Sequence, residues 1–378
     1  MRIIHTSDLH LGKKVHEYSM IEDQAFILDR IIDNVKRQEA DALLISGDVY
    51  DKSLPSEAAI NLLNDFLIAL SEMDLPVFII PGNHDSADRL SFGNWLMAKS
   101  SVFIQGPYTG KIRPHYLHDE FGKLAIYSLP FIRPSAIKSF FPDRQVDSYE
   151  DAVRLCIEDM DIDRNIRNII LAHQFVAGAS RTDSEILSLG GTDSISPSLF
   201  KDFDYVALGH IHRPQKMGAD HIRYSGSPLK YSISEQDDKK SLVQIDLLDK
   251  GNIGLSFLPL KPLRDLREIR GKYDQILLKD NYKNTNTDDY VHIVLEDELE
   301  VPNAMANLSL VYPNILKLDY DNLRTQAESG VKSLSAIEKR SEMDLLREFY
   351  LAQNGVEMST YQEDLSISIF KEISEEKA

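Results

Sequence analysis

Cysteine is almost absent from this sequence, because Cys156 is the only one among 378 residues and no disulfide can form within the chain. Chains without disulfides are typical of reducing compartments. The first residues, MRIIHTSDLHLG, contain no apolar segment followed by a cleavage site of the kind that directs secretion. We therefore expect a cytoplasmic protein.

Long hydrophobic runs are also missing, since no stretch approaches the roughly 20 apolar residues that a membrane-spanning helix needs. Hydrophobic residues nevertheless make up 43% of the chain, which is enough to build a sizeable core. The sequence thus predicts a soluble protein that does not cross a membrane. Its length favours more than one domain.

Positive charge is in deficit, with 42 Lys and Arg against 60 Asp and Glu and a net charge of −18. Nucleic-acid-binding domains usually carry a basic surface, so the composition alone argues against that class. Two facts weaken this argument. Carboxylates at a metal site are neutralised by the ion, and a local basic surface or a partner protein can also hold a nucleic acid.

Apolar strands alternate with amphipathic helices over roughly the first two thirds of the chain, which is the pattern of an α/β core. Strands are predicted at 2–6, 42–46, 77–80, 169–172 and 205–208, and helices at 22–38, from Ser56 onward and at 149–160. The pattern changes after residue 241. A hairpin is followed by a basic stretch at 261–271 and by a strand, a helix and a strand within 289–320, which predicts a small second α/β domain.

The C-terminal stretch 341–378 contains three Lys or Arg and nine Asp or Glu. Two segments of it, EMDLLREFYLAQ and YQEDLSISIFKEI, have apolar residues at helical spacing. Two such helices are too small to form a core of their own. We therefore expect this segment to dock on another surface.

Each of five predicted strands is followed directly by Asp, Asn or His residues. In chain order these are Asp8 and His10, then Asp48, then Asn83, His84 and Asp85, then His173, then His210 and His212. Ligands of open α/β sheets gather at the carboxyl ends of strands. If the last strand continues, residues 210 and 212 point to the same side. One such residue alone is most often a turn or surface residue, but five strand ends together favour a shared site.

Mixed carboxylate and imidazole ligands suit Mn²⁺, Fe²⁺ or Zn²⁺ better than Mg²⁺. Seven candidate ligands are too many for one octahedral ion with an open position, but they fit two ions about 3.5–4 Å apart that share a carboxylate and a water. Such a pair activates water near neutral pH and neutralises charge on a phosphate. His84, beside Asn83 and Asp85, is then the candidate general acid.

The ordered blocks DLH (8–10), GD (47–48), GNHD (82–85), His173 and GHIH (209–212) resemble the calcineurin-like metallophosphoesterase superfamily. The resemblance implies an α/β sandwich of two mixed β-sheets flanked by helices, with a small α/β capping domain and C-terminal helices. Within the superfamily, HTSDLHLGK, PGNHDSADRL and RYSGSPLKYSISE are similar to DNA nuclease subunits that work with a coiled-coil ATPase.

This resemblance implies two Mn²⁺ ions that share the Asp48 carboxylate. The other ligands would be Asp8, His10 and His212 for one ion, and Asn83, His173 and His210 for the other. His84 would act as the acid or transition-state stabiliser, with Asp85 as a second catalytic candidate. Arg89, Ser227 and Lys230 would approach the DNA backbone, and no role is assigned to Asp51.

The resemblance also implies a nuclease domain over 1–260, a DNA-capping domain over 261–335 and a docking segment for the ATPase over 341–378. The basic stretch 261–272 is compatible with phosphate contacts, although it reads equally well as a solvated surface. Helices near 62–70 and 91–98 resemble those that pair two nuclease subunits, so we expect a homodimer within a heterotetramer.

Two other functions use the same residues differently. A stand-alone phosphatase or small-molecule phosphodiesterase would have the same metal centre, but protein phosphatases of the superfamily carry an Arg just after the Gly-Asp block, where GDVYDKSLP has Lys52. A non-catalytic scaffold should have lost ligands, and none is missing. We predict a Mn²⁺-dependent DNA exonuclease and endonuclease.

Overall fold

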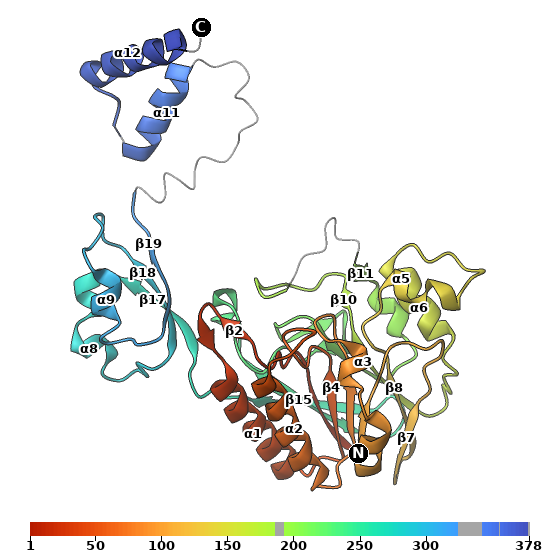
Figure 1. The fold of residues 1–378 in the computed structure, drawn as a ribbon. Coiled ribbons are helices and arrows are strands. Elements are labelled where there is room, and N and C mark those ends of the chain that lie inside the picture. The colour runs from red at the N-terminus through yellow and green to blue at the C-terminus, as the bar shows by residue number, and fades with distance from the viewer. Residues whose placement is uncertain (186–192, 324–341, 355, 377–378) are drawn as a thin grey trace. The chain divides into compact units, whose positions relative to one another are not determined.

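The computed structural model describes residues 1–185, 193–323, 342–354 and 356–376 (Figure 1). The chain divides into two compact units, residues 1–267 and residues 268–378. All the strand ends singled out above belong to the first unit.

The first unit contains a six-stranded sheet with the order β16-β15-β1-β4-β5-β6. Strands β1, β4, β5 and β6 run parallel to one another, whereas β15 and β16 pair antiparallel. In the order of the sheet, these strands span Ile253–Pro259, Ser241–Leu247, Arg2–Thr6, Ala42–Ser46, Val77–Ile80 and Val102–Ile104.

A second six-stranded sheet has the order β13-β14-β12-β9-β8-β7. Its four inner strands are parallel and its two edge strands are antiparallel to their neighbours. In the order of the sheet, the strands span Gln215–Met217, Ala219–Tyr224, Tyr205–Gly209, Arg167–His173, Gly122–Ser128 and His115–Asp119.

The two sheets pack face to face and share one buried hydrophobic cluster. Ile3, Leu44 and Phe78 of the first sheet contribute to it, as do Ile126 and Leu171 of the second. Parallel strands covered on both faces are expected to be apolar throughout, which explains why ALLIS and VFII are continuous runs rather than alternating ones. The sandwich of two mixed sheets therefore follows from the pattern of the strands.

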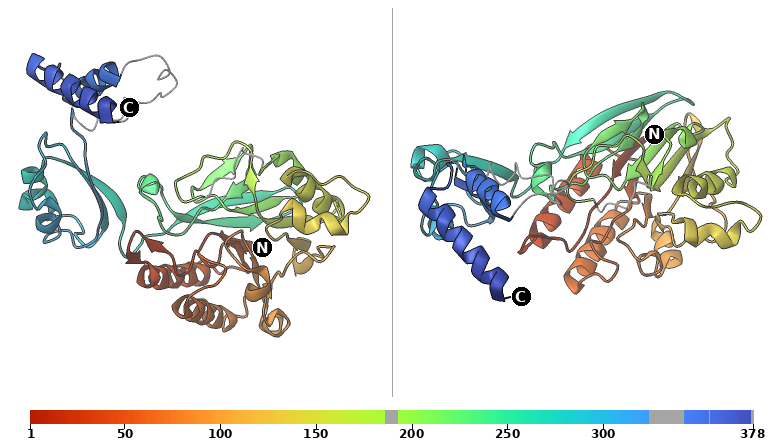
Figure 2. Two further views of the ribbon diagram at one scale, coloured as in Figure 1. Left: turned by 45° about the horizontal axis from the view of Figure 1, so that its top comes forward. Right: turned by 90° about the horizontal axis from the view of Figure 1, so that it is seen from above.

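Helices cover the outer faces of the sandwich (Figures 1 and 2). Helices α1 (Ile21–Arg37) and α2 (Glu57–Ser71) lie beside the first sheet, and α5 (Pro134–Ile137) and α6 (Tyr149–Glu158) lie beside the second. Short elements complete this unit: β2 (Lys14–Val15), β3 (Tyr18–Ser19), α3 (Ala87–Leu90), α4 (Asn94–Met97), β10 (Phe175–Val176) and β11 (Ser194–Ile195).

The boundaries of the main helices have clear local causes. In α1, Ile27, Ile31 and Val35 are buried at intervals of four residues, as an amphipathic helix requires. The Ser56 side chain accepts a hydrogen bond from the backbone N–H of Ala59 and caps α2, as predicted. The predicted strands and helices of this unit are therefore confirmed to within a few residues.

The predicted strand at 205–208 is present, but it does not continue through the histidine pair. Strand β12 ends at Gly209, and His210 has a φ of 105°, so the chain leaves the sheet before the histidine pair. Residues 210 and 212 lie in a loop, and strand periodicity does not set the direction of their side chains. Hydrogen bonds to neighbouring loops set the direction of these side chains instead, such as the one from the His210 backbone N–H to Asp8 Oδ1 at 2.9 Å.

The second unit contains a three-stranded sheet with the order β17-β18-β19, formed by Leu266–Gly271, Tyr290–Leu295 and Ile315–Tyr320. Short helices α7 (Tyr273–Ile276), α8 (Lys279–Tyr282) and α9 (Ala304–Leu308) complete it. Its separate core includes Ile276, Val291, Ile293, Leu308 and Ile315. The strand, helix and strand predicted within 289–320 are thus confirmed.

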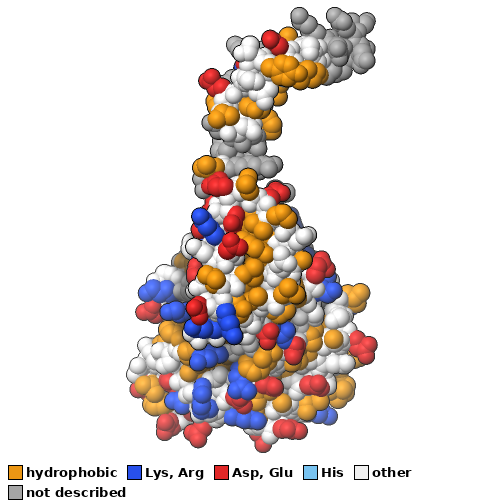
Figure 3. All heavy atoms as spheres, turned by 90° about the vertical axis from the view of Figure 1, so that its left-hand side faces the viewer, with side chains coloured by type: hydrophobic (Ala, Val, Ile, Leu, Met, Phe, Trp, Pro, Cys, Tyr) orange, Lys and Arg blue, Asp and Glu red, His pale blue; other side chains and the backbone are white. Residues whose placement is uncertain are grey.

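The surface of this second unit is partly hydrophobic. Figure 3 shows hydrophobic side chains along the face that carries α8 and α9. The exposed large hydrophobic residues of this part of the chain are Leu278, Leu299, Met305, Leu310 and Leu323. Residues 268–323 also contain eleven Asp or Glu but only five Lys or Arg, so the unit is acidic.

The predicted C-terminal helices are present as α11 (Glu342–Asn354) and α12 (Thr360–Glu376), whereas residues 341, 355, 377 and 378 of the expected docking segment lie outside the described residues. The helices contact each other, because Arg347 Nε lies 2.7 Å from Glu363 Oε1 and Gln362 Nε2 lies 2.9 Å from the Tyr350 hydroxyl. Exposed hydrophobic residues on or between them are Phe349, Leu351, Val356, Tyr361, Leu365, Ile367 and Ile369.

Within the described part of the chain, no helix is long and apolar enough to cross a membrane.

Candidate metal centre

The carboxyl ends of the parallel strands from both sheets meet at one edge of the sandwich. Asp8 and His10 follow β1, Asp48 follows β4, and the loop after β5 carries Asn83 and His84. From the second sheet, His173 ends β9, and His210 and His212 follow β12. Parallel strands place their carboxyl ends at the same edge, which is why residues more than 200 positions apart come into contact.

Two glycines allow the ends of the two sheets to approach closely. A Cβ on Gly209 would lie 1.7 Å from the carbonyl oxygen of Ser46, and a Cβ on Gly47 would lie 2.2 Å from His173 Nδ1. Gly47 also has a φ of +85°, which favours glycine. A side chain at either position would force the strand ends apart, so these glycines set the spacing of the site.

The backbone is strained at the same place. Among the described residues, four of the nine non-glycine residues with positive φ are candidate ligands: Asp8 (54°), His10 (46°), Asp48 (45°) and His210 (105°). Each such conformation typically costs about 1–3 kcal/mol and persists only where surrounding contacts hold it, which is common at functional sites. Backbone hydrogen bonds provide this hold, from the Asp8 N–H to the Gly47 carbonyl at 3.0 Å and from the His10 N–H to the Asp48 carbonyl at 2.9 Å.

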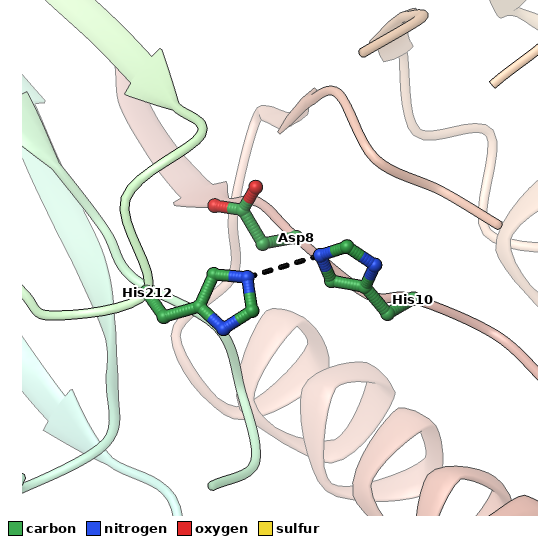
Figure 4. Close-up of side chains that lie close together, drawn as sticks. All are labelled: Asp8, His10 and His212. Atoms are coloured by element: carbon green, nitrogen blue, oxygen red, sulfur yellow. Dashed lines mark hydrogen bonds between the residues drawn. The ribbon is translucent and has the colours of Figure 1, made fainter. Parts of the chain in front are cut away.

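One group of ligand atoms is formed by Asp8, His10 and His212, whose side chains are all buried (Figure 4). One ligand atom from each lies within 4.8 Å of those of the other two. The Nε2 atoms of His10 and His212 lie 3.0 Å apart. These three residues come from loops that belong to different sheets.

Asp48 lies between this group and a second one. Its Oδ2 atom is 3.6 Å from His10 Nε2 and 3.3 Å from His173 Nε2. On the far side, Asn83 Oδ1 is 3.1 Å from His173 Nε2 and 2.9 Å from His210 Nδ1. The structure therefore brings all seven predicted ligands together, with the Asp48 carboxylate in the middle.

In three of these histidines, Nδ1 lies near a carboxylate or carbonyl oxygen. Nδ1 of His173 is 2.8 Å from the Ser46 carbonyl oxygen, which fixes a proton on Nδ1 and turns Nε2 towards Asp48. Nδ1 of His10 is 3.5 Å from Asp51 Oδ1, and Nδ1 of His212 is 3.4 Å from Glu235 Oε1. Such partners orient metal-binding histidines in proteins.

Asp51 and Glu235 are site residues that the sequence analysis did not assign. Asp51 also pairs with Lys13 at 2.9 Å, and the fully buried Glu235 pairs with Lys240 at 2.6 Å. Asp51 lies three residues after Asp48, so its closeness to a predicted ligand was a weak sign that it belongs to the site. Glu235 lies in a short turn 23 residues after His212, and nothing in its surroundings in the sequence marks it.

Burial and mutual charge shift the pKa values of these groups in opposite directions. Burial lowers the pKa of His10 to about 4. Burial also opposes protonation of His173, but the neighbouring Asp48 carboxylate outweighs it and raises the pKa of His173 to about 9. For Asp48, burial favours the neutral form, yet His173 and His10 hold its pKa well below the usual range. Asp48 is therefore a carboxylate, as a metal ligand must be.

His84 lies at the open side of the site. Its backbone N–H donates to Asp48 Oδ1 at 2.9 Å, and its Nδ1 is 2.8 Å from the carbonyl oxygen of Asp51. Its ring packs edge-on against His10, with 4.9 Å between the centroids. Because Nδ1 donates to a carbonyl oxygen, Nε2 is the nitrogen free to face a substrate.

Asp85, the second catalytic candidate, has a different environment. Its carboxylate accepts hydrogen bonds from the backbone N–H groups of Val49 at 3.0 Å, Tyr50 at 2.8 Å and Gly82 at 2.9 Å. Burial and the nearby Asp48 carboxylate raise the pKa of Asp85 to about 6. Asp85 thus joins the loops after β4 and β5 and holds Asp48 and His84 in place.

The three predicted DNA-contacting residues differ in exposure. Arg89 is exposed, and its guanidinium donates to the Ser53 carbonyl at 2.9 Å. Ser227 is fully buried, and its hydroxyl donates to the Leu229 carbonyl at 2.7 Å. Lys230 reaches the Gln236 carbonyl at 2.5 Å. Of the three, Arg89 has the side chain that solvent reaches most freely.

The donor set fits divalent metal ions. Its oxygen and imidazole donors suit first-row transition metals, their side chains converge from five loops, and the carboxylate between the two groups is ionised. A buried cluster of this kind is stabilised when a cation compensates its charges.

Comparisons with known proteins agree with this geometry. A family model described as calcineurin-like phosphoesterase matches residues 1–214, and one described as type 5 capsule protein repressor C-terminal domain matches residues 262–354. The SbcD chain of the nuclease SbcCD from Staphylococcus epidermidis is 33% identical over 371 residues, which cover 96% of each chain.

Two solved structures show a weaker likeness. A dimetal phosphatase from Danio rerio has 10% identity and a TM-score of 0.42, and it aligns over 69% of this chain and 96% of its own. The phosphoesterase Yfce from E. coli has 14% identity and a TM-score of 0.29, over 69% and 100% of the two chains. Membership follows from the first family model, which covers more than half of the chain, and from the full-length relative. The chain belongs to the calcineurin-like phosphoesterase family and, within it, to the SbcD group of nuclease subunits.

Proposed function

We propose that this chain is the Mn²⁺-dependent nuclease subunit of an SbcCD-type complex in DNA repair, recombination and replication. It hydrolyses phosphodiester bonds at the ends of duplex DNA and within single strands and hairpins. The full-length likeness to the SbcD chain of a nuclease supports the choice of DNA as substrate.

The observation that carries the proposal is the position of Asp48 between two groups of ligands. Asp8, His10 and His212 would hold one Mn²⁺ ion on one side of it, and Asn83, His173 and His210 the other ion on the opposite side. When bound, such ions supply a nucleophilic water and neutralise the charge that develops on a phosphate.

The protein itself supplies the proton for the leaving oxygen. His84 Nδ1 is held by the Asp51 carbonyl, so in the protonated ring the N–H at Nε2 points away from this bond. A protonated imidazole there donates to the leaving oxygen and acts as the general acid. Asp85 contributes indirectly, because it fixes the two loops that carry Asp48 and His84.

Phosphate contacts outside the metal centre are assigned to Arg89 first. Its exposed guanidinium suits a phosphate oxygen, whereas Ser227 and Lys230 would have to exchange internal hydrogen bonds for DNA contacts. We keep Ser227 and Lys230 as residues near the DNA path. Ser227 also supports the loop that carries His212, because its backbone N–H donates to the His212 carbonyl at 3.1 Å.

Residues 1–260 form the nuclease domain in this proposal, and 261–335 form a domain that caps the DNA. The match of a C-terminal family model to 262–354 supports a dedicated second domain. Charge does not add support, because the segment is acidic and Arg270 is paired with Glu268 and Asp321. Its phosphate contacts would therefore be few and local.

Residues 341–378 dock on an SbcC-type coiled-coil ATPase. The hydrophobic side chains exposed on α11 and α12, such as Leu365 and Ile369, support a protein partner. Two copies of the chain pair through α2 and the 91–98 region within a cytoplasmic heterotetramer. Ile68, Phe92 and Trp95 are exposed there by 50%, 83% and 66%, which suits such an interface.

The test is degradation of end-labelled linear duplex DNA by the purified chain with Mn²⁺, with and without the partner ATPase and ATP. A small chromogenic phosphodiester is run in parallel. Cleavage of DNA that the partner and ATP extend is the expected result.

The parallel substrate separates the proposal from its main alternative. Turnover of the small ester with DNA intact under every condition would retain the metal centre and assign the chain to small-molecule phosphodiesterases. Loss of both activities in the presence of bound Mn²⁺ would favour a non-catalytic scaffold.

A further inference from the structure

Two buried polar side chains that are not candidate ligands meet behind the loop that carries Asp8 and His10. Gln24 belongs to α1 and is fully buried, and Tyr231 lies in the turn before residue 233 with 4% of its surface exposed. The Gln24 amide Nε2 donates to the Tyr231 hydroxyl at 3.1 Å, although the two residues are 207 positions apart. An amide is costly to bury unless its hydrogen bonds are made, so the partners of Gln24 indicate its role.

Gln24 makes its other hydrogen bonds with the backbone of the ligand loop. Its Nε2 donates to the His10 carbonyl oxygen at 2.7 Å, and its Oε1 accepts from the Gly12 backbone N–H at 2.9 Å. Both His10 and Gly12 have a positive φ, at 46° and 88°, so surrounding contacts must hold this part of the loop in place. A single side chain therefore fixes the loop on both sides of Leu11.

Tyr231 holds the same loop one residue earlier. Its hydroxyl donates at 2.5 Å to the carbonyl of Leu9, which lies between the candidate ligands Asp8 and His10. Its ring lies edge-on beside two candidate ligands, with its centroid 5.7 Å from that of His10 and 5.9 Å from that of His212. The hydroxyl thus fixes the backbone, and the ring limits the rotation of the two imidazoles.

These contacts reach one of the two groups of candidate ligands. The loop carries two of the three residues in the group that Figure 4 shows, and the third, His212, faces the Tyr231 ring. Within the part of the chain that the structure describes, neither Gln24 nor Tyr231 has a hydrogen bond or a ring contact with the group on the far side of Asp48. Loss of either side chain should therefore affect the two groups unequally.

We propose that Gln24 and Tyr231 are positioning residues for the metal ion that Asp8, His10 and His212 would hold. The inference rests on the proposed function, because it takes this group as a Mn²⁺ site. Both residues act through the loop and the imidazoles, which they keep directed at a common point before an ion binds. Outer partners of this kind typically contribute about 10- to 100-fold to metal affinity.

The test is calorimetric titration of the full chain with Mn²⁺ in two backgrounds, each of which retains one complete group of ligands. His210→Ala removes a ligand from the far group, and His212→Ala removes one from the group that Gln24 and Tyr231 support. In the His210→Ala background, Gln24→Met should weaken Mn²⁺ binding by about 10-fold or more. In the His212→Ala background, it should change the affinity by less than about twofold, since changes at sites without shared partners are nearly additive.

The variants are chosen so that the chain still folds. Methionine is close to glutamine in length and volume, so Gln24→Met removes the hydrogen bonds while filling the same space. Tyr231→Phe removes only the hydroxyl and should weaken Mn²⁺ binding in the same background. Asn34→Leu is the matched control, since this amide is also buried in α1 but donates to the Arg30 carbonyl of the same helix at 2.7 Å. It should leave the Mn²⁺ affinity unchanged in both backgrounds.

Selectivity between the backgrounds separates positioning from a general contribution to stability. A residue that only stabilises the fold would lower the free energy of unfolding in urea and either leave Mn²⁺ affinity unchanged or weaken it equally in the two backgrounds. Either result for Gln24→Met and Tyr231→Phe would overturn the proposal.

Failure of this inference can be told apart from failure of the proposed function. A chain that cleaves DNA but shows equal losses of Mn²⁺ affinity in the two backgrounds would keep the nuclease and remove the positioning role. A chain that shows the selective loss but leaves DNA intact, with and without the partner ATPase and ATP, would keep the positioning role and remove the nuclease.

Discussion

At the scale of single residues, the proposed roles divide between side chains that would hold metal and one side chain, His84, that would move a proton. Asp48 is the residue on which both metal groups depend, since its carboxylate faces His10 and His173. His84 contacts the same carboxylate only through its backbone N–H. Substitutions at these two positions should therefore have different effects.

Asp48→Asn should weaken metal binding at both positions, because the amide keeps the shape of the side chain but loses the charge. We expect a loss of Mn²⁺ affinity larger than the roughly 10- to 100-fold typical of changes in outer-sphere partners. Calorimetric titration with Mn²⁺ measures it. Unchanged metal content with unchanged activity would contradict the two-ion arrangement.

His84→Ser should leave Mn²⁺ affinity within about threefold of wild type while slowing hydrolysis by roughly 10²- to 10⁴-fold, the usual contribution of a general acid. Affinity comes from calorimetry and the rate from hydrolysis of a phosphodiester with a poor leaving group. A leaving group that needs no proton provides the control, since its rate should fall less. If affinity and rate fell together, His84 would be a ligand.

At the scale of elements, close contact between the strand ends of the two sheets determines the site. Gly209, the last residue of β12, lies against Ser46, the last residue of β4. The candidate ligands His210 and Asp48 follow one and two residues after these strand ends. The contact is possible because Gly209 has no Cβ that would meet the Ser46 carbonyl oxygen.

Gly209→Ala should destabilise the fold by about 1–3 kcal/mol, because its Cβ would lie 1.7 Å from the Ser46 carbonyl oxygen and the strands must move apart. It should also lower Mn²⁺ affinity, since His210 moves with the strand end. Urea unfolding and metal titration check the two effects. Gly254→Ala in β16 is the control, because the nearest atom to its Cβ is 3.6 Å away and the change should be small.

An ion pair between a buried arginine and a half-buried aspartate fixes the far edge of the second sheet. Arg167, at the start of β9, is buried and donates to both carboxylate oxygens of Asp119, at the end of β7. Burial favours the neutral form of Asp119, but Arg167 and the N-terminal ammonium outweigh it and lower the pKa of Asp119 to about 2. The pair thus contributes stability when Asp119 is ionised.

Asp119→Asn should cost about 2 kcal/mol at pH 7, less than breaking a fully buried pair, because Asp119 is only half-buried and Arg167 keeps its bonds to two backbone carbonyls. The folded pKa lies below the unfolded value of about 3.8, so this stability is present above pH 3.8 and is lost as the pH falls towards 2. Unfolding free energies of the two chains should therefore converge in acid. A gap that widened in acid would contradict the pairing.

At the scale of the whole molecule, two units and a pair of terminal helices each have a distinct surface. The first unit contains every candidate metal ligand, and the exposed hydrophobic side chains of α11 and α12 lie outside it. Hydrolysis and partner binding should therefore be separable by truncation and by point substitution.

Deleting residues 341–378 should keep Mn²⁺-dependent hydrolysis within about twofold and abolish binding to the ATPase, as measured by co-purification. In the full chain, Leu365→Asp combined with Ile369→Asp should have the same effect, because these residues share one face of α12. Ser368→Asp adds a charge on the same helix and serves as the control. Recovery of the truncated chain with the ATPase would refute the docking role.

The sequence by itself determined the strands, the main helices and the types of residue at the strand ends. Short apolar runs such as ALLIS, bounded by turn residues, favour buried strands, and Asp8, His10 and Asp48 just after such strands indicated metal chemistry. These features depend on the order of apolar and polar residues over short stretches, which can be seen in the sequence without knowledge of the fold.

Tertiary structure alone decided the direction in which the side chains of the candidate ligands point. His210 and His212 leave the sheet instead of continuing it, and contacts with loops of the other sheet orient them. Glu235 reaches His212, and Asn83 reaches His173 and His210, only when distant segments pack together. The physical reason is that hydrogen bonds and ring contacts across a sandwich depend on distances in space, which spacing along the chain does not fix.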